Sequence, residues 1–161
     1  MKKSVYFIIA LIAIILLILA FFIFREEDTI SEETVTNMKL TSSAFENGGN
    51  IPKEYTCDGD DINPQLKIEE IPNNAKSLVL IMDDPDAPVG TWVHWVVYNI
   101  DPETTIIEED SAPTNAIQGI NSWGNTNYGG PCPPSGTHRY FFRLYALDIV
   151  DNTKVLRNKE K

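Results

Sequence analysis

A strand, a rigid turn and a returning strand follow one another between residues 77 and 100, and they constrain the fold more than any other part of the sequence. Residues 77–82, SLVLIM, have the apolar and partly branched composition of a β-strand. The turn, DPDAPVG at 84–90, is partly preset because each proline fixes its own φ and restricts the residue before it. Asp84 and Asp86 therefore stand at a strand end beside a rigid loop, an arrangement that suits a binding site.

The two histidines of the chain each stand where a loop meets a strand. His94 lies near the start of the returning strand, and His138 follows a second Gly/Pro loop, GGPCPPSGT at 129–137. Considered one at a time, about half of such histidines are buried core residues whose hydrogen bonds are made within the protein. Two of them beside rigid loops, on rows that face each other, favour a shared pocket. Alternation along the strands gives these rows as Leu78, Leu80, Met82 and Asp84; Trp92, His94, Val96 and Tyr98; and His138, Tyr140, Phe142 and Leu144.

The rest of the pattern predicts an all-β fold. Turn signals such as NGGN, DGDD, IPNN and DPE separate short apolar segments. No segment after residue 25 has a convincing helical period. The strands predicted from these segments cover residues 38–43, 65–70, 78–83, 92–100, 105–108 and 140–147.

The N-terminal segment 4–24 is 21 residues long, uncharged and almost entirely apolar. At about 1.5 Å per residue, a helix of this length reaches roughly 30 Å, the thickness of a bilayer's hydrocarbon core. Two lysines precede it and no A-x-A pattern ends it, so the sequence predicts an uncleaved single-pass transmembrane anchor over residues 1–24 with its N-terminus inside. A cleavable signal peptide is the alternative. Residues 25–36 are predicted to form an acidic linker, and residues 37–161 an extracellular or periplasmic domain held at the cell membrane.

The acidic balance of the domain argues against some partners. All 23 Asp and Glu lie after residue 25, with 10 of the 13 Lys and Arg, so residues 26–161 carry a formal net charge of −13. No Lys or Arg occurs between Lys76 and Arg139. Nucleic acid is therefore not an expected partner, because its binding needs a basic face that neutralises phosphates. An anionic lipid surface would also repel the domain.

Three motifs together resemble one protein family. DPDAP at 84–88, HW at 94–95 and GPCPPSGTHRY at 130–140 are similar to motifs of the phosphatidylethanolamine-binding protein family, in its bacterial and archaeal Raf-kinase-inhibitor-like branch. The resemblance runs from about Met38 to Asp148 and implies an antiparallel Greek-key β-sandwich with a pocket for a small anion or a phospholipid headgroup. It also implies a cis peptide before Pro88. The pocket residues that it implies are Asp84, Asp86, His94, Pro134, His138 and Tyr140.

Members of this family usually continue beyond the strand that ends near Asp148, with a helix and a further strand. The resemblance therefore implies that the C-terminal part of the family fold is missing from this chain. We expect the missing cover to expose a sheet edge, and the domain to be marginally stable or to self-associate.

The implied pocket combines donors and carboxylates. The histidines, the Tyr140 hydroxyl and loop amides can donate hydrogen bonds to an anionic oxygen, whereas Asp84 and Asp86 would repel an isolated anion. Two explanations for the carboxylates remain open. The carboxylates orient the histidines and keep them protonated, or they meet a cationic group on the same ligand. A zwitterion such as phosphoethanolamine satisfies both.

Other chemistries fit the sequence less well. Two histidines and a carboxylate could form a metal triad, but the family that the chain resembles requires no metal. Residues 58–69 begin like a calcium loop, yet Ile62 and Asn63 stand where a ligand and a glycine are needed. Ser135 lacks the nucleophile-elbow pattern of a hydrolase. The sequence therefore predicts no catalytic residue, no metal and no cofactor.

Cys57 and Cys132 are the two cysteines of the chain, and both lie in predicted loops. A disulfide between them is permitted if the domain lies in an oxidising compartment. We expect the bond, with two independent free thiols as the alternative.

The function predicted from the sequence is a membrane-anchored, outward-facing binding module without a reaction of its own. Its expected ligand is a small anion or zwitterion of the phosphate or phosphoethanolamine kind. The alternative is a regulator that inhibits a kinase or a serine protease by docking on it, as relatives in the family do.

Overall fold

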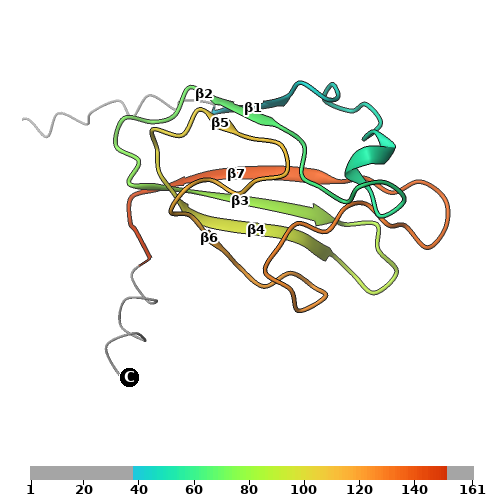
Figure 1. Ribbon diagram of the computed structural model, residues 1–161. Coiled ribbons are helices and arrows are strands. Elements are labelled where there is room, and N and C mark those ends of the chain that lie inside the picture. The colour runs from blue at the N-terminus through green and yellow to red at the C-terminus, as the bar shows by residue number, and fades with distance from the viewer. Residues whose placement is uncertain (1–37, 152–161) are drawn as a thin grey trace, which may run out of the picture. The chain divides into compact units, whose positions relative to one another are not determined.

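The computed structural model describes residues 38–151 of the chain, and residues 1–37 and 152–161 lie outside this description. The strands form two antiparallel sheets, one with the order β1-β2-β5 and one with the order β6-β4-β3-β7 (Figure 1). No α-helix occurs in the described part of the chain. The elements in chain order are β1 (Lys39–Ser42), the 3₁₀ turn η1 (Lys53–Tyr55), β2 (Leu66–Glu69), β3 (Ser77–Asp84), β4 (Trp92–Ile100), β5 (Ile106–Ile107), β6 (Ile117–Gln118) and β7 (Phe141–Leu147).

All six strands predicted from the sequence are present, each with ends within one residue of those expected. The strand that the sequence did not reveal is β6, whose two residues pair with Val97 and Tyr98 of β4. Two residues are too few to show an alternation of apolar and polar side chains. Only the pairing with β4 makes this segment a strand.

The four-stranded sheet has the strand order of a Greek key. Its strands β3, β4, β6 and β7 come first to fourth along the chain and lie side by side in the order 4-1-2-3. The path from β4 to β6 passes through β5, which belongs to the other sheet. Strand β7 is an edge of its sheet among the described residues, and the self-association expected from such an edge stays a prediction.

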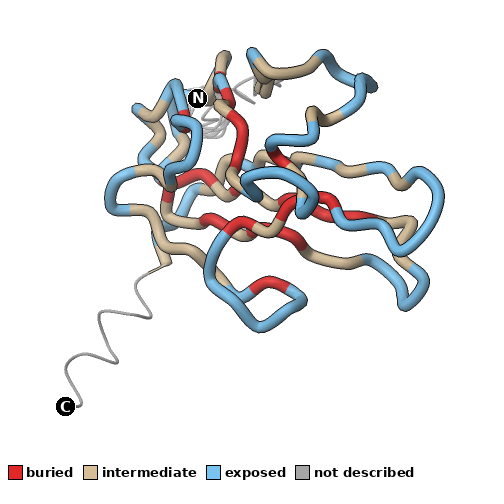
Figure 2. Tube along the Cα trace, turned by 45° about the vertical axis from the view of Figure 1, so that its right-hand side comes forward, coloured by how far each residue is buried: buried red, intermediate tan, exposed pale blue. Residues whose placement is uncertain are grey.

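The core lies between the two sheets, and β3 and β4 each contribute three buried hydrophobic residues to it. From β3 the four-stranded sheet supplies Leu78, Leu80 and Met82, which are fully buried on the face that meets the other sheet. The three-stranded sheet supplies Ile68 and Ile107 from the opposite layer. Figure 2 shows buried residues concentrated along the strands, with exposed ones in the loops. Burying each such aliphatic side chain contributes roughly 1.5–3 kcal/mol, so this shared core holds the two sheets together.

Strand β4 contains two irregularities that change which side chains face the core. Met82 pairs with Trp95 and Asp83 with Val93, so His94 is an extra residue in a β-bulge. A second register shift lies near Asn99, whose φ is 55°. After the bulge, Trp95 and Val97 point into the core, whereas Val96 and Tyr98 do not. The prediction that Trp92, His94, Val96 and Tyr98 share one face is therefore wrong beyond the bulge.

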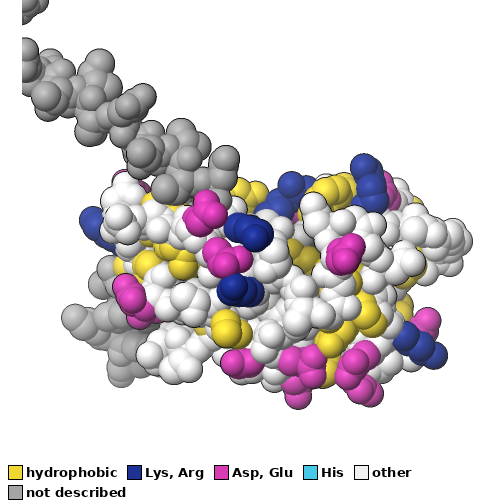
Figure 3. All heavy atoms as spheres, turned by 90° about the horizontal axis from the view of Figure 1, so that it is seen from above, with side chains coloured by type: hydrophobic (Ala, Val, Ile, Leu, Met, Phe, Trp, Pro, Cys, Tyr) yellow, Lys and Arg dark blue, Asp and Glu magenta, His cyan; other side chains and the backbone are white. Residues whose placement is uncertain are grey.

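The charged surface of the domain is mixed. On the face shown in Figure 3, Lys and Arg side chains stand singly among Asp and Glu, and no continuous basic patch is present on that face. Two of the arginines lie close to carboxylates, Arg139 with Asp86 and Arg143 with Asp83. These arginines are therefore engaged within the protein.

Two predictions that depended on the N-terminal segment are corrected. The part of the chain that the structure describes has no helix long and apolar enough to cross a bilayer. Its helical element η1 has three residues, whereas a span needs about 20. The fold that joined a β-sandwich to a transmembrane helix, and the cell-membrane localisation that followed from it, are wrong on this finding. Segment 4–24, on which both predictions rested, lies outside the described residues.

The turn between β3 and β4 also differs from the expectation. No cis peptide bond occurs among residues 38–151, so the bond before Pro88 is trans. The turn closes instead through a hydrogen bond from the Gly90 amide to the Ala87 carbonyl, 3.1 Å long, and Gly90 adopts a φ of 101°. A residue without a Cβ takes this φ at no steric cost.

We predict that Asn99 stabilises the end of β4 in two ways. Its side chain donates to the Asp151 carbonyl at 2.6 Å and accepts from the Asp151 amide at 2.9 Å, and its backbone is left-handed. Asn99→Ala should lower the free energy of unfolding by about 2–3 kcal/mol. Asn99→Gly should cost about 1 kcal/mol less, because glycine adopts the same φ without strain. Urea unfolding of both variants measures the difference, and equal losses would contradict the role of the backbone conformation.

Candidate functional site

Asp84 and His138 form the centre of the candidate site. Asp84 is the last residue of β3, and its Oδ2 lies 2.7 Å from Nδ1 of His138. Their side chains are 5% and 10% exposed, so the pair is largely shielded from water. Because a carboxylate oxygen only accepts, Nδ1 carries the proton and the ring orientation is fixed. The other oxygen, Oδ1, accepts the Asp86 amide at 2.8 Å.

Asp86 is engaged with Arg139 rather than with a histidine. Its Oδ2 accepts the Arg139 backbone amide at 2.9 Å and Nε at 2.8 Å, while Oδ1 accepts a terminal guanidinium nitrogen at 2.6 Å. These hydrogen bonds hold the pKa of the Asp86 carboxyl well below its usual range. Asp86 thus fastens the β3–β4 turn to the residue after His138. Pro134, also expected in the pocket, lies exposed in the loop before His138.

His94 is buried in the bulge of β4. Its Nδ1 lies 2.7 Å from the Gly129 carbonyl oxygen, which can only accept, so Nδ1 carries a proton. Burial lowers the pKa of His94, and this effect outweighs the opposite influence of the Gly129 carbonyl and the Asp84 carboxylate. Without a ligand the structure therefore favours a neutral imidazole for His94, which does not support the first of the two explanations left open by the sequence, that carboxylates keep the histidines protonated.

An aromatic wall surrounds His94. The Trp123 ring lies edge-on to two rings, with its centroid 4.8 Å from that of His94 and 5.5 Å from that of Trp92. The Tyr140 ring also lies edge-on to His94, with 5.2 Å between the centroids. Gly129 makes room for this packing, since a Cβ there would lie only 2.8 Å from Cζ3 of Trp123. Trp92 is in turn the cross-strand partner of Asp84. We call the group formed by these residues the site cluster; its members are Asp84, Trp92, His94, Trp123, His138 and Tyr140.

Two buried donors in the site cluster lack a hydrogen bond. Neither the indole N–H of Trp92 nor the hydroxyl of Tyr140 has a partner among the described residues. The Cys132 amide is near enough to the Tyr140 oxygen to oppose a rise in its pKa, but it is not in hydrogen-bond geometry. Burial dominates, with the Asp84 carboxylate adding to it, and raises the pKa of Tyr140 to about 12. The hydroxyl therefore keeps its proton at neutral pH and remains a donor.

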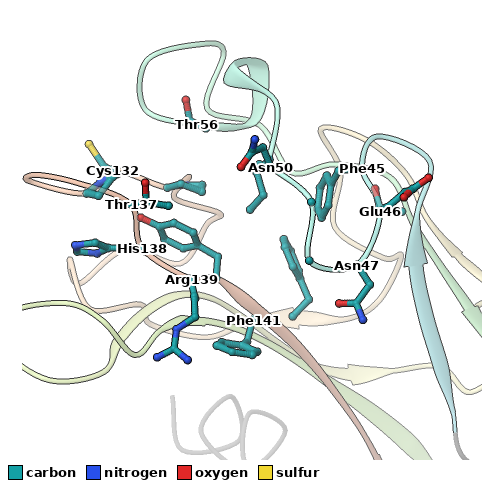
Figure 4. A pocket seen from close by; sticks show the side chains of 18 of the residues that line it. Phe45, Glu46, Asn47, Asn50, Thr56, Cys132, Thr137, His138, Arg139 and Phe141 are labelled. Atoms are coloured by element: carbon teal, nitrogen blue, oxygen red, sulfur yellow. The ribbon is translucent and has the colours of Figure 1, made fainter.

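A groove of about 1020 Å³ adjoins the site cluster. It runs between β1 and the start of β7, and we call it the β1–β7 groove. His138 and Tyr140 line it, and the other members of the site cluster do not. In Figure 4 the segment from Cys132 to Arg139 forms one side of this groove and the loop from Phe45 to Asn50 the other. The groove thus gives solvent access to one side of the cluster.

The other residues considered in the sequence lie outside the site cluster. Among residues 38–151 no three His, Cys, Asp or Glu side chains are placed to hold a metal ion. In the segment that begins like a calcium loop, Asp61 accepts the Gly130 amide at 2.6 Å and has a φ of 57°. Ser135 is exposed. The structure joins Cys57 and Cys132 in a disulfide whose Cα atoms are 5.5 Å apart.

Sequence reasoning missed Trp92 as an unpartnered donor and Trp123 altogether. Trp123 lies in the loop SWGNTN, where neither strand alternation nor a helical period marks a residue as buried or functional. The available signal was a large aromatic residue in a loop of small polar residues that leads to Gly129. Trp123 is 46% exposed, and its ring packs edge-on against His94 and Trp92.

Comparison with known proteins identifies the family. The family model described as phosphatidylethanolamine-binding protein matches residues 41–160. A UPF0098 protein of Methanothermobacter thermautotrophicus is 51% identical over 128 residues, covering 76% of this chain and 85% of that protein. A UPF0098 protein of Aquifex aeolicus is 52% identical over 118 residues, covering 70% and 69%. One from Archaeoglobus fulgidus is 48% identical over 125 residues, which are 74% of this chain but 43% of the relative.

Two solved structures are similar as well. CT736 of Chlamydia trachomatis, described as a homolog of phosphatidylethanolamine-binding protein, has a TM-score of 0.69 at 42% identity, with 76% of this chain and 87% of that one covered. YbcL of Escherichia coli, described as a member of the mammalian PEBP family, has a TM-score of 0.67 at 32% identity, with 71% and 79% covered. The chain described above belongs to the phosphatidylethanolamine-binding protein family.

Proposed function

We propose that this protein is a non-catalytic binding protein whose site cluster accepts a small anionic or zwitterionic ligand, such as phosphate or phosphoethanolamine. The observation that carries the proposal is the pair of buried, unpartnered donors, the Trp92 indole and the Tyr140 hydroxyl. A buried polar group without a partner costs about 1–3 kcal/mol. A ligand oxygen that accepts from these donors would remove that cost, so the cluster favours a ligand rich in acceptors.

The histidines supply further groups for such a ligand. Nδ1 of His94 is committed to the Gly129 carbonyl and Nδ1 of His138 to Asp84, so on each ring Nε2 is the atom left to meet a ligand. On a neutral ring with a protonated Nδ1, Nε2 is an acceptor. It becomes a donor to an anion only when the ring takes up a second proton. Binding of a fully ionised anion at His94 should therefore be accompanied by proton uptake.

Among the described residues near the cluster, none is arranged as an activated nucleophile. The one serine in the loop before His138 is Ser135, which is exposed and makes no hydrogen bond to a described residue. A nucleophile needs a base within hydrogen-bond reach and a third group that orients that base. Asp84 and His138 form an oriented pair, but no hydroxyl or thiol is hydrogen-bonded to it.

We predict that anion affinity falls as pH rises. Burial holds the pKa of His94 in the free protein below its usual value of about 6.5, and a bound anion favours the protonated ring. Sulfate affinity should therefore be highest near pH 5 and decline as His94 loses its proton, reaching its minimum by about pH 8. Sulfate is the suitable probe because its own charge is constant over this range. Titration calorimetry measures the affinity, and buffers of different ionisation enthalpy measure the proton uptake.

The control for this pH dependence is His94→Gln, which should bind sulfate more weakly and with a flatter pH profile. An unchanged slope in the variant would assign the titrating proton to another group. A wild-type affinity that is constant from about pH 5 to 8 would contradict the involvement of His94.

Tyr140→Phe separates a binding role from a structural one. Removing a buried hydroxyl that has no partner should leave the free energy of unfolding unchanged or slightly higher. The loss of its hydrogen bond to an anion should weaken sulfate binding by about tenfold or more, because hydrogen bonds to charged groups contribute about 1.5–3 kcal/mol. Tyr145→Phe, on the exposed face of β7, is the matched control and should change neither quantity. Full sulfate affinity in Tyr140→Phe would remove this residue from the site.

Asp84→Asn distinguishes two roles for the carboxylate. The distance of 2.7 Å to His138 favours the orienting role, so the variant should bind plain phosphate about tenfold more weakly. If Asp84 instead served only a ligand ammonium group, phosphate binding would be retained and only phosphoethanolamine binding would fall. Calorimetry with both ligands at one pH decides between the two.

A second candidate function is docking on a protein partner. It is favoured by the outer face of the edge strand β7, where Phe141 and Tyr145 are 38% and 45% exposed and Arg143 lies 4.8 Å from the centre of the Phe141 ring. Exposed aromatic and arginine side chains are enriched in protein interfaces. Inhibition of a serine protease or kinase that was lost in Tyr145→Ser but kept in Asp84→Asn would support this candidate.

A further inference from the structure

The disulfide between Cys57 and Cys132 lies within reach of solvent and beside the site cluster. The bonded cysteines are 75 residues apart in the chain, and both are exposed and line the β1–β7 groove. Figure 4 shows Cys132 on the same side of this groove as Thr137 and His138. A thiol reductant in solution can therefore approach the bond from the groove.

The disulfide is the last attachment before an unattached stretch of chain. Just before it, the Gly130 amide donates to Asp61 at 2.6 Å and the Pro131 carbonyl accepts the Cys57 amide at 3.2 Å. Residues 133–137 are all exposed and make no hydrogen bond to any other described residue. The chain is next fastened at His138, through Asp84. The bond to Cys57 thus limits how far the segment before His138 can move.

The segment that the disulfide restrains, residues 132–138, lies next to the site cluster. His138 ends it, and the Cys132 amide that begins it lies close to the Tyr140 hydroxyl. The Gly129 carbonyl that fixes His94 is only three residues before Cys132. When the disulfide opens, the chain on the groove side of His138 and Tyr140 loses its covalent attachment. The groups that would meet an anion are then less well held in place.

We propose that the Cys57–Cys132 disulfide is a redox-sensitive switch for the anion site, with the oxidised form preorganised for binding and the reduced form weakened. This inference rests on the proposed function of the site cluster and adds its regulation. Binding is favoured when the protein does not have to order a loop at the same time. If reduction leaves the binding-competent loop conformation about one-tenth populated, the apparent dissociation constant rises about tenfold.

The redox step is a thiol–disulfide exchange with a dithiol reductant, either a small dithiol or a thioredoxin-type protein. A thiolate of the reductant attacks one sulfur of the Cys57–Cys132 bond and forms a mixed disulfide, releasing the other cysteine as a thiol. The second reductant thiol then displaces the remaining cysteine. Two electrons and two protons pass to the cysteines, which become two thiols, and the reductant becomes a disulfide.

The test measures sulfate and phosphoethanolamine binding to the chain in its oxidised, dithiothreitol-reduced and reoxidised forms, with free thiols counted in each. The expected result is about tenfold weaker binding after reduction and recovery after reoxidation. Cys57→Ser/Cys132→Ser should bind as weakly as the reduced protein and should not respond to dithiothreitol, which controls for direct effects of the reductant. Equal affinity in oxidised and reduced protein would overturn the switch while leaving the anion site intact.

A second measurement shows whether the effect is local. Hydrogen exchange should become faster on reduction at the amides of Gly130 and Arg139, which donate to Asp61 and Asp86, and remain unchanged in β3 and β4. Faster exchange throughout the sheets would overturn the proposal, because the disulfide would then stabilise the whole domain rather than the site. Absence of sulfate and phosphoethanolamine binding in the oxidised protein would instead remove the proposed function, and the switch with it.

Discussion

The pairing of β3 with strands on both sides is the constraint on which the rest of the structure depends. Strand β4 pairs with one edge of β3 and β7 with the other, in registers that bring Asp84 opposite Trp92 and Asp83 opposite Phe141. The end of β3 is therefore enclosed by the start of β4 and the residues that lead into β7. A carboxylate in this place cannot be fully hydrated, and it must be satisfied by hydrogen bonds. The His138 ring and the Asp86 amide provide them.

The bulge in β4 allows two consecutive residues, His94 and Trp95, to be buried, one in the site cluster and one in the core. Side chains of a regular strand alternate between two faces, so His94 and Trp95 would otherwise point in opposite directions. The extra residue allows Trp95 to fill the core while His94 is also buried, against the Gly129 carbonyl and the rings of Trp123 and Tyr140. Bulges are common beside functional sites because they change the direction of one side chain without breaking the sheet. Here the redirected side chain is the histidine.

Much of this arrangement follows from local sequence, and the remainder depends on long-range contacts. Alternation and turn residues locate six of the strands, and loop position identifies Asp84, His94 and His138 as neighbours of rigid turns. Sequence alone does not reveal the bulge at His94, because a bulge is defined by the pairing with the neighbouring strand. It also does not show that Asp86 meets Arg139, 53 residues later. Trp123 was missed for the same reason, since its partners Trp92 and His94 lie in another segment of the chain.

The charges around the site cluster restrict which anion the proposed site could accept. The nearby arginines are already paired, Arg139 with Asp86 and Arg143 with Asp83, and the described chain has no other Lys or Arg between Lys76 and its end at residue 151. Attraction to an anion must therefore come from neutral donors and from protonation of a histidine, next to the Asp84 carboxylate. Such a site gains little from each added negative charge and is opposed by Asp84. The proposed site should therefore prefer a singly charged or zwitterionic ligand to a polyanion.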